Sequence, residues 1–140
     1  MATRMMMRVP LDVSAAESEH VLVEDLGGGL FIIVSVPAVS TQCALGDVVR
    51  GEWVEGMCEF RGVEIRGGNT TLRMLVDASL IDTLLAHLEA LGCRHIQPLP
   101  GMVSVNIPVD APAHGLSVLI GDYVEQGLIT VAEGDLDSMG

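Results

Sequence analysis

The sequence contains no lysine, and its cationic side chains are seven arginines beside four histidines. Nineteen aspartates and glutamates outnumber them, so the formal net charge is −12. Proteins that bind nucleic acids through phosphates need clustered cations, and anionic membranes attract the same kind of cluster. We therefore expect neither as a partner. No arginine follows Arg94, whereas acids continue to the end: Asp110, Asp122, Glu125, Glu133, Asp135 and Asp137.

Aromatic residues and cysteines are also scarce. Four aromatic residues leave Val, Leu, Ile and eight adaptable Met to fill the core of a chain that is 49% apolar. The three cysteines form no C-x-x-C pair, which argues against a disulfide framework or a zinc site. The histidines lack the i, i+4 spacing of helical metal sites. We expect no metal and no cofactor.

Long hydrophobic runs are absent as well. No stretch reaches the roughly 18 apolar residues that a transmembrane helix needs. The N-terminal "MATRMMMRVP" has no apolar segment of secretory length. The sequence therefore predicts a cytoplasmic protein. Its 140 residues fit a single domain that can have two lobes.

Residues 1–68 are typical of β-structure. The stretch "EHVLVEDLGGGLFIIVSVP" predicts two strands joined at Gly27-Gly28-Gly29, because glycine supplies the positive φ of a tight hairpin. The stretch "LGDVVRGEWVEGMCEFRGVEI" predicts another hairpin, with its turn at Glu55-Gly56. Val49 and Trp53 alternate with polar residues there, so we expect their face to pack on a core. The prediction is a small antiparallel sheet or partial barrel.

In residues 69–140 the spacing of apolar residues changes, and segments with the period of a helix alternate with strands. The strand "TLRMLVD" precedes a helix in "ASLIDTLLAHLEALGC", which Ser79 is placed to cap and Gly92 to end. Two strands, "RHIQPLPG" and "MVSVNIPV", follow. A weaker helix in "APAHGLSVLIGDYVEQG" and a strand in "LITVAEGD" complete the order βαββαβ. This order predicts a ferredoxin-like lobe, so the chain is α+β with a junction at Gly67-Gly68. The helix carries one apolar stripe: Leu84, Leu85, Leu88 and Leu91.

Arg73 is the residue that most needs an explanation, since it stands inside an apolar strand. Alternation places it opposite Leu72 and Met74, on the face that predicted helices do not cover. The favoured interpretation is an ion pair with Asp47 or Glu64 across the two lobes. The alternative is an anion clamp in a cleft between the lobes, formed by Arg73 with Asn69, Thr70 and Asp47.

Catalytic patterns are not evident. The chain has no G-x-S-x-G, H-E-x-x-H or phosphate-binding G-x-x-x-x-G-K-[ST] motif. Cys93 follows a helix C-terminus, where the partial negative charge raises a thiol pKa. Asp47 in "ALGDVV" can order a turn or bind a ligand, and the turn is favoured. No catalytic residue is named, and enzymatic activity is not the favoured hypothesis.

A resemblance emerges from several segments taken together. "CALGDVVRGE", "GGNTTLRMLV", "LEALGCR", "LPGMVSVNIPVD" and "YVEQGLITVAEGDL" resemble an uncharacterised bacterial family catalogued as domain of unknown function 4265. The likeness runs from Val9 to Leu136. Around Val34–Thr41 the chain departs from the family's aromatic-rich "NIPFF" pattern. The resemblance implies a small acidic cytosolic protein and no established activity.

Two functional hypotheses follow. The first is a non-catalytic binding module that recognises a basic protein, as an immunity-like protein or regulatory adaptor does, or that forms a homodimer. Asp122, Glu125, Glu133, Asp135 and Asp137 would bind the partner. The second is a sensor or enzyme for a small anionic ligand, with Arg73 at its site.

Overall fold

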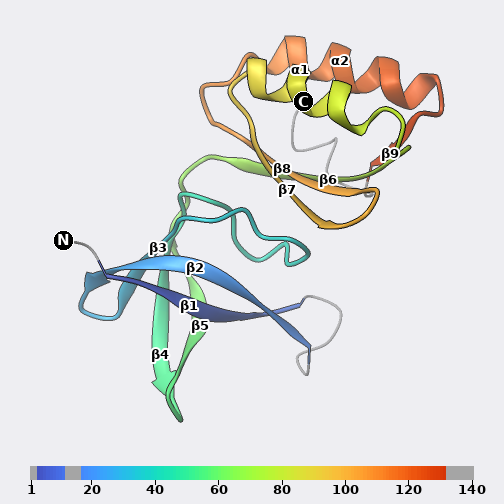
Figure 1. Cartoon of the computed structure of the whole chain (residues 1–140). Helices are drawn as coiled ribbons and strands as arrows, with labels where there is room; N and C mark the ends of the chain where they lie inside the picture. Colours follow the sequence, from blue (N-terminus) through green and yellow to red (C-terminus); the bar gives the residue numbers. More distant parts are fainter. Residues whose placement is uncertain (1–2, 12–16, 132–140) are drawn as a thin grey trace. The chain divides into compact units, whose positions relative to one another are not determined.

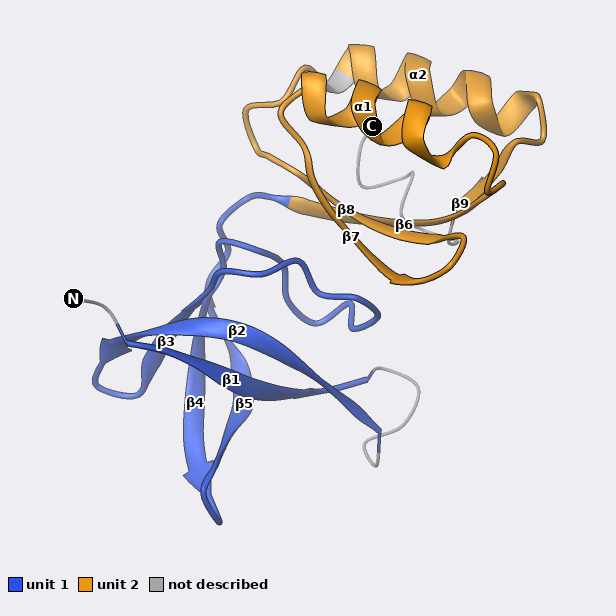
Figure 2. Ribbon diagram, viewed as in Figure 1, with its two compact units in different colours: residues 1–69 blue, residues 70–140 orange. Residues whose placement is uncertain are grey.

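The computed structural model describes residues 3–11 and 17–131. The chain forms two compact units, residues 1–69 and 70–140 (Figure 2). We call them the barrel unit and the helical unit. The boundary differs by one residue from the junction that the sequence predicts after residue 68. Antiparallel pairing dominates both sheets, and two helices complete an α+β fold.

The barrel unit consists of five strands in a closed barrel. They are β1 (Arg4–Pro10), β2 (Ser18–Gly27), β3 (Leu30–Ile33), β4 (Val48–Val54) and β5 (Met57–Ile65). Each strand pairs antiparallel with the next, and β1 then pairs parallel with β5. In a meander of five strands the first and last run the same way, so closure has to be parallel. The predicted partial barrel is therefore closed.

The barrel core follows the alternation of its strands. Met7 and Val9 of β1 are fully buried, and Gly51 of β4 faces Met7. A Cβ at Gly51 would lie 2.7 Å from the Met7 Cε, so glycine makes room for the methionine there. The remaining buried apolar residues come from all the other strands and one loop: Val21, Val23, Phe31, Ile33, Cys43, Val49, Cys58 and Phe60.

Trp53 does not join this core, contrary to the expectation from its alternation with Val49. Val49 is buried, but Trp53 is 58% exposed. The reason is the length of β3, whose pairing with β4 ends at the Leu30–Arg50 pair. Trp53 lies three residues farther toward the tip of the β4–β5 hairpin, so no strand flanks it on that side.

The helical unit has the order βαββαβ. Its elements are β6 (Thr70–Val76), α1 (Ile81–Ala90), β7 (Arg94–Leu99), β8 (Met102–Ile107), α2 (Ala113–Glu125) and β9 (Ile129–Val131). The sheet has the strand order β7-β8-β6-β9, with antiparallel pairing throughout. Both helices cover the same face of the sheet (Figure 1). Leu72, Met74 and Val76 of β6 point to that face and join the core with Leu84, Leu88, Leu116 and Ile120.

The helix ends are specified by glycine. Gly92 after α1 and Gly127 after α2 both have positive φ. The amide of the residue following each glycine donates to a carbonyl of the last turn, as in a Schellman motif. The start of α1 differs from the prediction, because Ser79 does not cap it. Asp77 instead accepts hydrogen bonds from the amide and hydroxyl of Ser79, and α1 begins two residues later.

Candidate functional site

Asp47 lies immediately before β4, with 1% of its surface exposed. Its carboxylate accepts hydrogen bonds from the amides of Ala44 and Gly67, at 3.0 and 2.8 Å. Arg66 Nη1 lies 3.4 Å from the same carboxylate. These contacts tie the loop before β4 to the segment after β5. Asp47 therefore orders the turn, which is the interpretation that the sequence favoured.

Residues 66–69 lead out of the barrel after β5. Arg66 and Gly67 contact Asp47 there, and Asn69 adds a further contact to the loop before β4. The Asn69 Nδ2 donates to the carbonyl oxygen of Leu45 at 2.8 Å. Gly67 passes so close to Gly46 that an added Cβ would lie 2.6 Å from the Gly46 carbonyl oxygen. Sequence reasoning missed Arg66 and Gly67, although "RGGN" directly after a strand was a signal for a close backbone approach.

Arg73 belongs to the helical unit, where it is half-buried on β6. It faces away from the helices, as alternation predicted, together with Thr71 and Leu75. Thr70 points to the opposite face, with Leu72, so Thr70 and Arg73 lie on different sides of the sheet. The ion pair expected between Arg73 and Asp47 or Glu64 would join the two units, and it stays a prediction. Within the barrel unit, Glu64 pairs with Arg50 at 3.2 Å.

The acids named for partner binding fall in two groups. Asp122 and Glu125 are exposed on α2. Val118 lies four residues before Asp122 and seven before Glu125, so the three side chains share one stripe of the helix. Val118 is 49% exposed. Glu133, Asp135 and Asp137 lie outside the described residues.

Every arginine of the barrel unit is ion-paired within that unit. Arg8 on β1 bonds Glu59 on β5, its neighbour in the parallel pair. The hydrogen bond from Arg8 lowers the pKa of Glu59, and Glu59 in turn raises the pKa of Arg8. The other pairs are Arg4–Glu24, Arg50–Glu64, Arg61–Glu52 and Arg66–Asp47. The sequence could not specify these pairs, because they depend on strand register.

The thiols and imidazoles form no assembled site within residues 3–11 and 17–131. All three cysteines are buried and reduced. Burial raises the pKa of the Cys93 thiol, the predicted direction, although desolvation and not the helix end is the cause. His95 Nε2 lies 2.6 Å from Glu89. No group of three or more His, Cys, Asp or Glu in the described ranges is arranged to hold a metal ion.

A comparison with protein families shows which family the chain belongs to. The model of a family described as Domain of unknown function (DUF4265) matches residues 19–131. The chain belongs to the DUF4265 family. The match includes four of the five barrel strands and the whole described part of the helical unit. No curated protein matches the sequence.

This DUF4265 chain is also similar to a solved structure, described as a novel crystal structure of a hypothetical protein from Neisseria gonorrhoeae. The two share 22% sequence identity with a TM-score of 0.74. The alignment covers 97% of this chain and 96% of the other. At this identity the likeness supports a common fold. Within the described residues, none of the helices has the length and apolar character needed to cross a membrane.

Proposed function

We propose that this DUF4265 protein is a non-catalytic binding module that recognises a basic partner protein through the helical face of its helical unit. It would act in the cytoplasm as an immunity-like protein or regulatory adaptor. Surface complementarity, with no covalent step, would be its mechanism. The observation that carries this proposal is the separation of charge between the two faces of the helical unit.

Among the described residues of the helical unit, the carboxylates lie on the helices and the adjoining turns. Residues 70–140 contain nine acids and two arginines, a formal charge of −7. The acids among the described residues are all exposed: Asp77, Asp82, Glu89, Asp110, Asp122 and Glu125. Both arginines, Arg73 and Arg94, lie on strands instead. The helical layer is therefore acidic, with no arginine to neutralise it.

Such a layer is suited to electrostatic recognition. A surface of one charge sign attracts an oppositely charged partner over several ångströms and raises the association rate at low salt. Hydrogen bonds from the hydroxyl and amide of Ser79 lower the pKa of Asp77, so they favour its charged form. The exposed stripe Val118, Asp122 and Glu125 adds an apolar contact to two charges. This composition suits a partner surface rich in Arg or Lys.

We further propose that the helical unit is a ferredoxin-like lobe. The order βαββαβ, the antiparallel strand order β7-β8-β6-β9 and the position of both helices over one face support this. The arrangement makes one layer wholly helical, so that α1 and α2 present their acids side by side.

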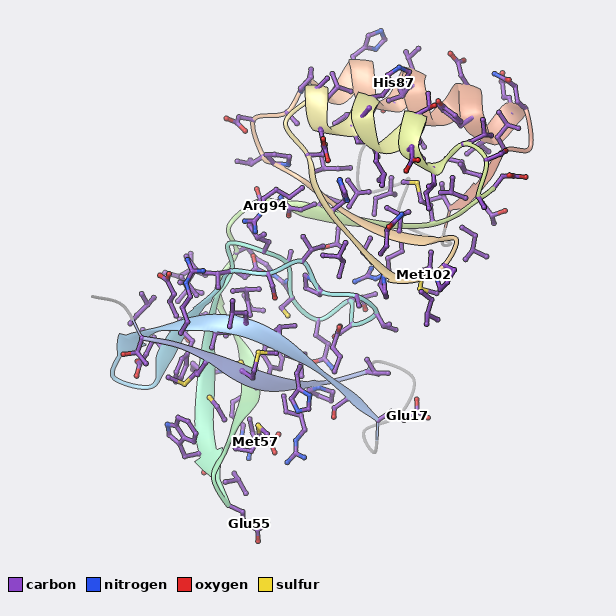
Figure 3. The ribbon with its side chains drawn as sticks, in the orientation of Figure 1. Glu17, Glu55, Met57, His87, Arg94 and Met102 are labelled. Carbon is purple, nitrogen blue, oxygen red and sulfur yellow. The ribbon has the colours of Figure 1, made fainter. Side chains whose placement is uncertain are left out.

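The test compares two double variants that remove equal charge. Asp122→Asn with Glu125→Gln neutralises the helical stripe, whereas Glu17→Gln with Glu55→Gln neutralises two exposed acids of the barrel unit (Figure 3). Each tagged protein is used to capture partners from the native host, with bound protein quantified by mass spectrometry at low and high salt.

We expect the wild type and the barrel variant to capture the same basic protein in stoichiometric amount. The helical variant should capture it at least about fivefold less, and added salt should weaken capture by the wild type. Equal capture by all three proteins would contradict the proposed surface. A wild type that captures no stoichiometric partner and is monomeric in solution would contradict the function itself.

A further inference from the structure

Trp53 is exposed although its position on β4 belongs to the inner face of the barrel wall. It pairs with Cys58 on β5, which has no exposed surface, and directly paired residues point to the same face of a sheet. Because β3 ends earlier, 58% of Trp53 remains exposed at the end of the barrel where the β2–β3 and β4–β5 turns lie. Tryptophan is largely buried on average, and exposed aromatic residues are frequent anchors for partner proteins. The open indole therefore needs a functional explanation.

Asp25 on β2 lies at the same end of the barrel. It also belongs to the inner face, because it pairs with the buried Phe31 on β3. A Cβ built on Gly51 would lie 2.8 Å from Phe31 Cε2 and 2.9 Å from Cys58 Sγ, so the strand partners of Asp25 and Trp53 meet around one glycine. Burial raises the pKa of the Cys58 thiol, and the charge of Asp25 raises that pKa further. A carboxylate and an open indole thus border the same cluster of core residues.

The charge of Asp25 is not neutralised by a cation. Its Oδ1 accepts a hydrogen bond from the amide of Gly27 at 2.7 Å, but Asp25 forms no ion pair with any residue in 3–11 or 17–131. The five arginines of the barrel unit are each paired with another acid. A second copy of the chain is a poor occupant, because a twofold contact brings a patch against itself and would oppose like charges. A favourable occupant therefore carries positive charge.

We propose that this end of the barrel docks an arginine side chain of another protein. The guanidinium would stack on the indole of Trp53, and the carboxylate of Asp25 would balance its charge. Arginine suits an indole better than lysine does, because its cation is planar and more weakly hydrated. The bordering turn of residues 27–29 is all glycine, and its Gly29 accepts a hydrogen bond from the amide of Gly51, so no side chain of that turn obstructs the approach. The site belongs to the barrel unit alone and goes beyond the acidic helical layer.

The first experiment uses the fluorescence of Trp53, which is the only tryptophan of the chain. The full-length protein is titrated at low salt with the peptide acetyl-Gly-Arg-Gly-Arg-Gly-amide and with matched peptides that carry lysine or the neutral isostere citrulline. We expect the arginine peptide to change the emission saturably. The citrulline peptide should bind at least about tenfold more weakly and the lysine peptide about two- to fivefold more weakly. No saturable change with arginine, or equal affinity for either matched peptide, would overturn the proposal.

The second experiment locates the site with variants, read by the fluorescence anisotropy of the dye-labelled arginine peptide. Trp53→Leu should weaken binding at least about fivefold and Trp53→Phe less, because the indole attracts cations most strongly. Asp25→Asn keeps an oxygen for the Gly27 amide and should weaken binding about threefold or more. Glu17→Gln removes the same charge well away from the hairpin tip that Met57 marks (Figure 3), and it should leave affinity unchanged.

Two outcomes of the second experiment would contradict the site. Equal binding by the wild type and Trp53→Leu would mean that the peptide binds elsewhere on the acidic surface. Equal weakening by Asp25→Asn and Glu17→Gln would mean that only net charge matters. Every protein in both experiments keeps the acids of α1 and α2, so neither outcome bears on the acidic helical layer.

Discussion

The two units use their arginines in opposite ways. In the barrel unit all five arginines are paired with acids of the same unit, mostly across neighbouring strands. In the described part of the helical unit, the arginines lie on strands and the acids lie on the helices and turns, so the strands that carry Arg73 and Arg94 bring no acid to their own sheet. Ion pairs thus engage five of the ten acids of the barrel unit, whereas the described acids of the helical unit lie on a layer without arginine. Net charge alone would not have distinguished the two.

The units also close their cores by different means. The barrel rolls one sheet onto itself, whereas the second sheet needs α1 and α2 to cover its apolar face. The only tryptophan, Trp53, is in the barrel unit, and both helices are in the other. Tryptophan fluorescence and far-ultraviolet circular dichroism therefore report on different units, and each prediction below can be read in both signals.

The largest effect is expected from Leu116→Ala in α2. Leu116 has no exposed surface and packs in the core of the helical unit. Loss of its side chain should lower the free energy of unfolding by about 2–5 kcal/mol. The helical signal should melt earlier in urea, while the Trp53 transition should move less. Equal shifts in both signals would mean that the two units unfold as one, and the comparison of separate cores would fail.

A smaller effect is expected from Asp47→Ala in the barrel unit. The substitution removes the acceptor for the amides of Ala44 and Gly67 and the partner of Arg66. We expect a loss of about 2 kcal/mol, seen mainly in Trp53 fluorescence. Asp47→Asn keeps one oxygen as an acceptor and should cost about half as much. An unchanged urea midpoint for Asp47→Ala would show that these contacts do not stabilise the fold.

Two glycine substitutions should have opposite signs. Gly67→Ala places a Cβ 2.6 Å from the Gly46 carbonyl oxygen, and the resulting backbone shift should cost about 1–3 kcal/mol. Gly121→Ala in α2 meets no atom within 4 Å and should stabilise the helical unit by about 0.5–1 kcal/mol. Thermal melts of both variants test the pair. Stabilisation by Gly67→Ala would show that residues 46 and 67 do not approach closely.

The smallest effect concerns pH and the Arg8–Glu59 pair. Because Arg8 holds the pKa of Glu59 below its ordinary value of 4.5, this pair stabilises the folded state above that pH. The contribution is lost as the pH falls through the lower folded-state pKa. We expect urea midpoints between pH 7 and 3 to fall less steeply for Glu59→Gln than for the wild type. Glu17→Gln serves as the charge-matched control, and identical curves for all three proteins would refute the coupling.

Local signals in the sequence predicted much of this fold. The Gly27-Gly28-Gly29 and Glu55-Gly56 turns occur where glycine was needed for positive φ. Leu84, Leu85 and Leu88 of the predicted stripe are buried, Leu91 is partly buried at the C-cap, and Gly92 follows the helix. Side-chain periodicity and backbone conformation are properties of a few neighbouring residues, so the sequence could indicate them. The DUF4265 resemblance was likewise readable from segments quoted directly from the chain, and the family match confirms it.

Features that depend on distant pairing could not be predicted. Nothing near β1 indicates that it will meet β5, about fifty residues later, so the closed barrel was expected to be partial. The exposure of Trp53 depends on where β3 ends, and the Arg66 contact with Asp47 depends on a loop approach. Ser79 had the composition of a helix cap, but the Asp77 side chain competes for it.

The parallel pairing that closes the barrel joins β1 and β5 through only two residue pairs, Met7 with Cys58 and Arg8 with Glu59. Each antiparallel pair of consecutive strands is also linked by the turn or loop between them, but β1 and β5 are not linked in this way. We therefore expect the barrel to open locally between β1 and β5, with β1 and β2 moving away together as one hairpin. Amide hydrogens along this line should exchange with solvent sooner than those between β4 and β5, and Met7 and Cys58 would be the first core residues to meet water.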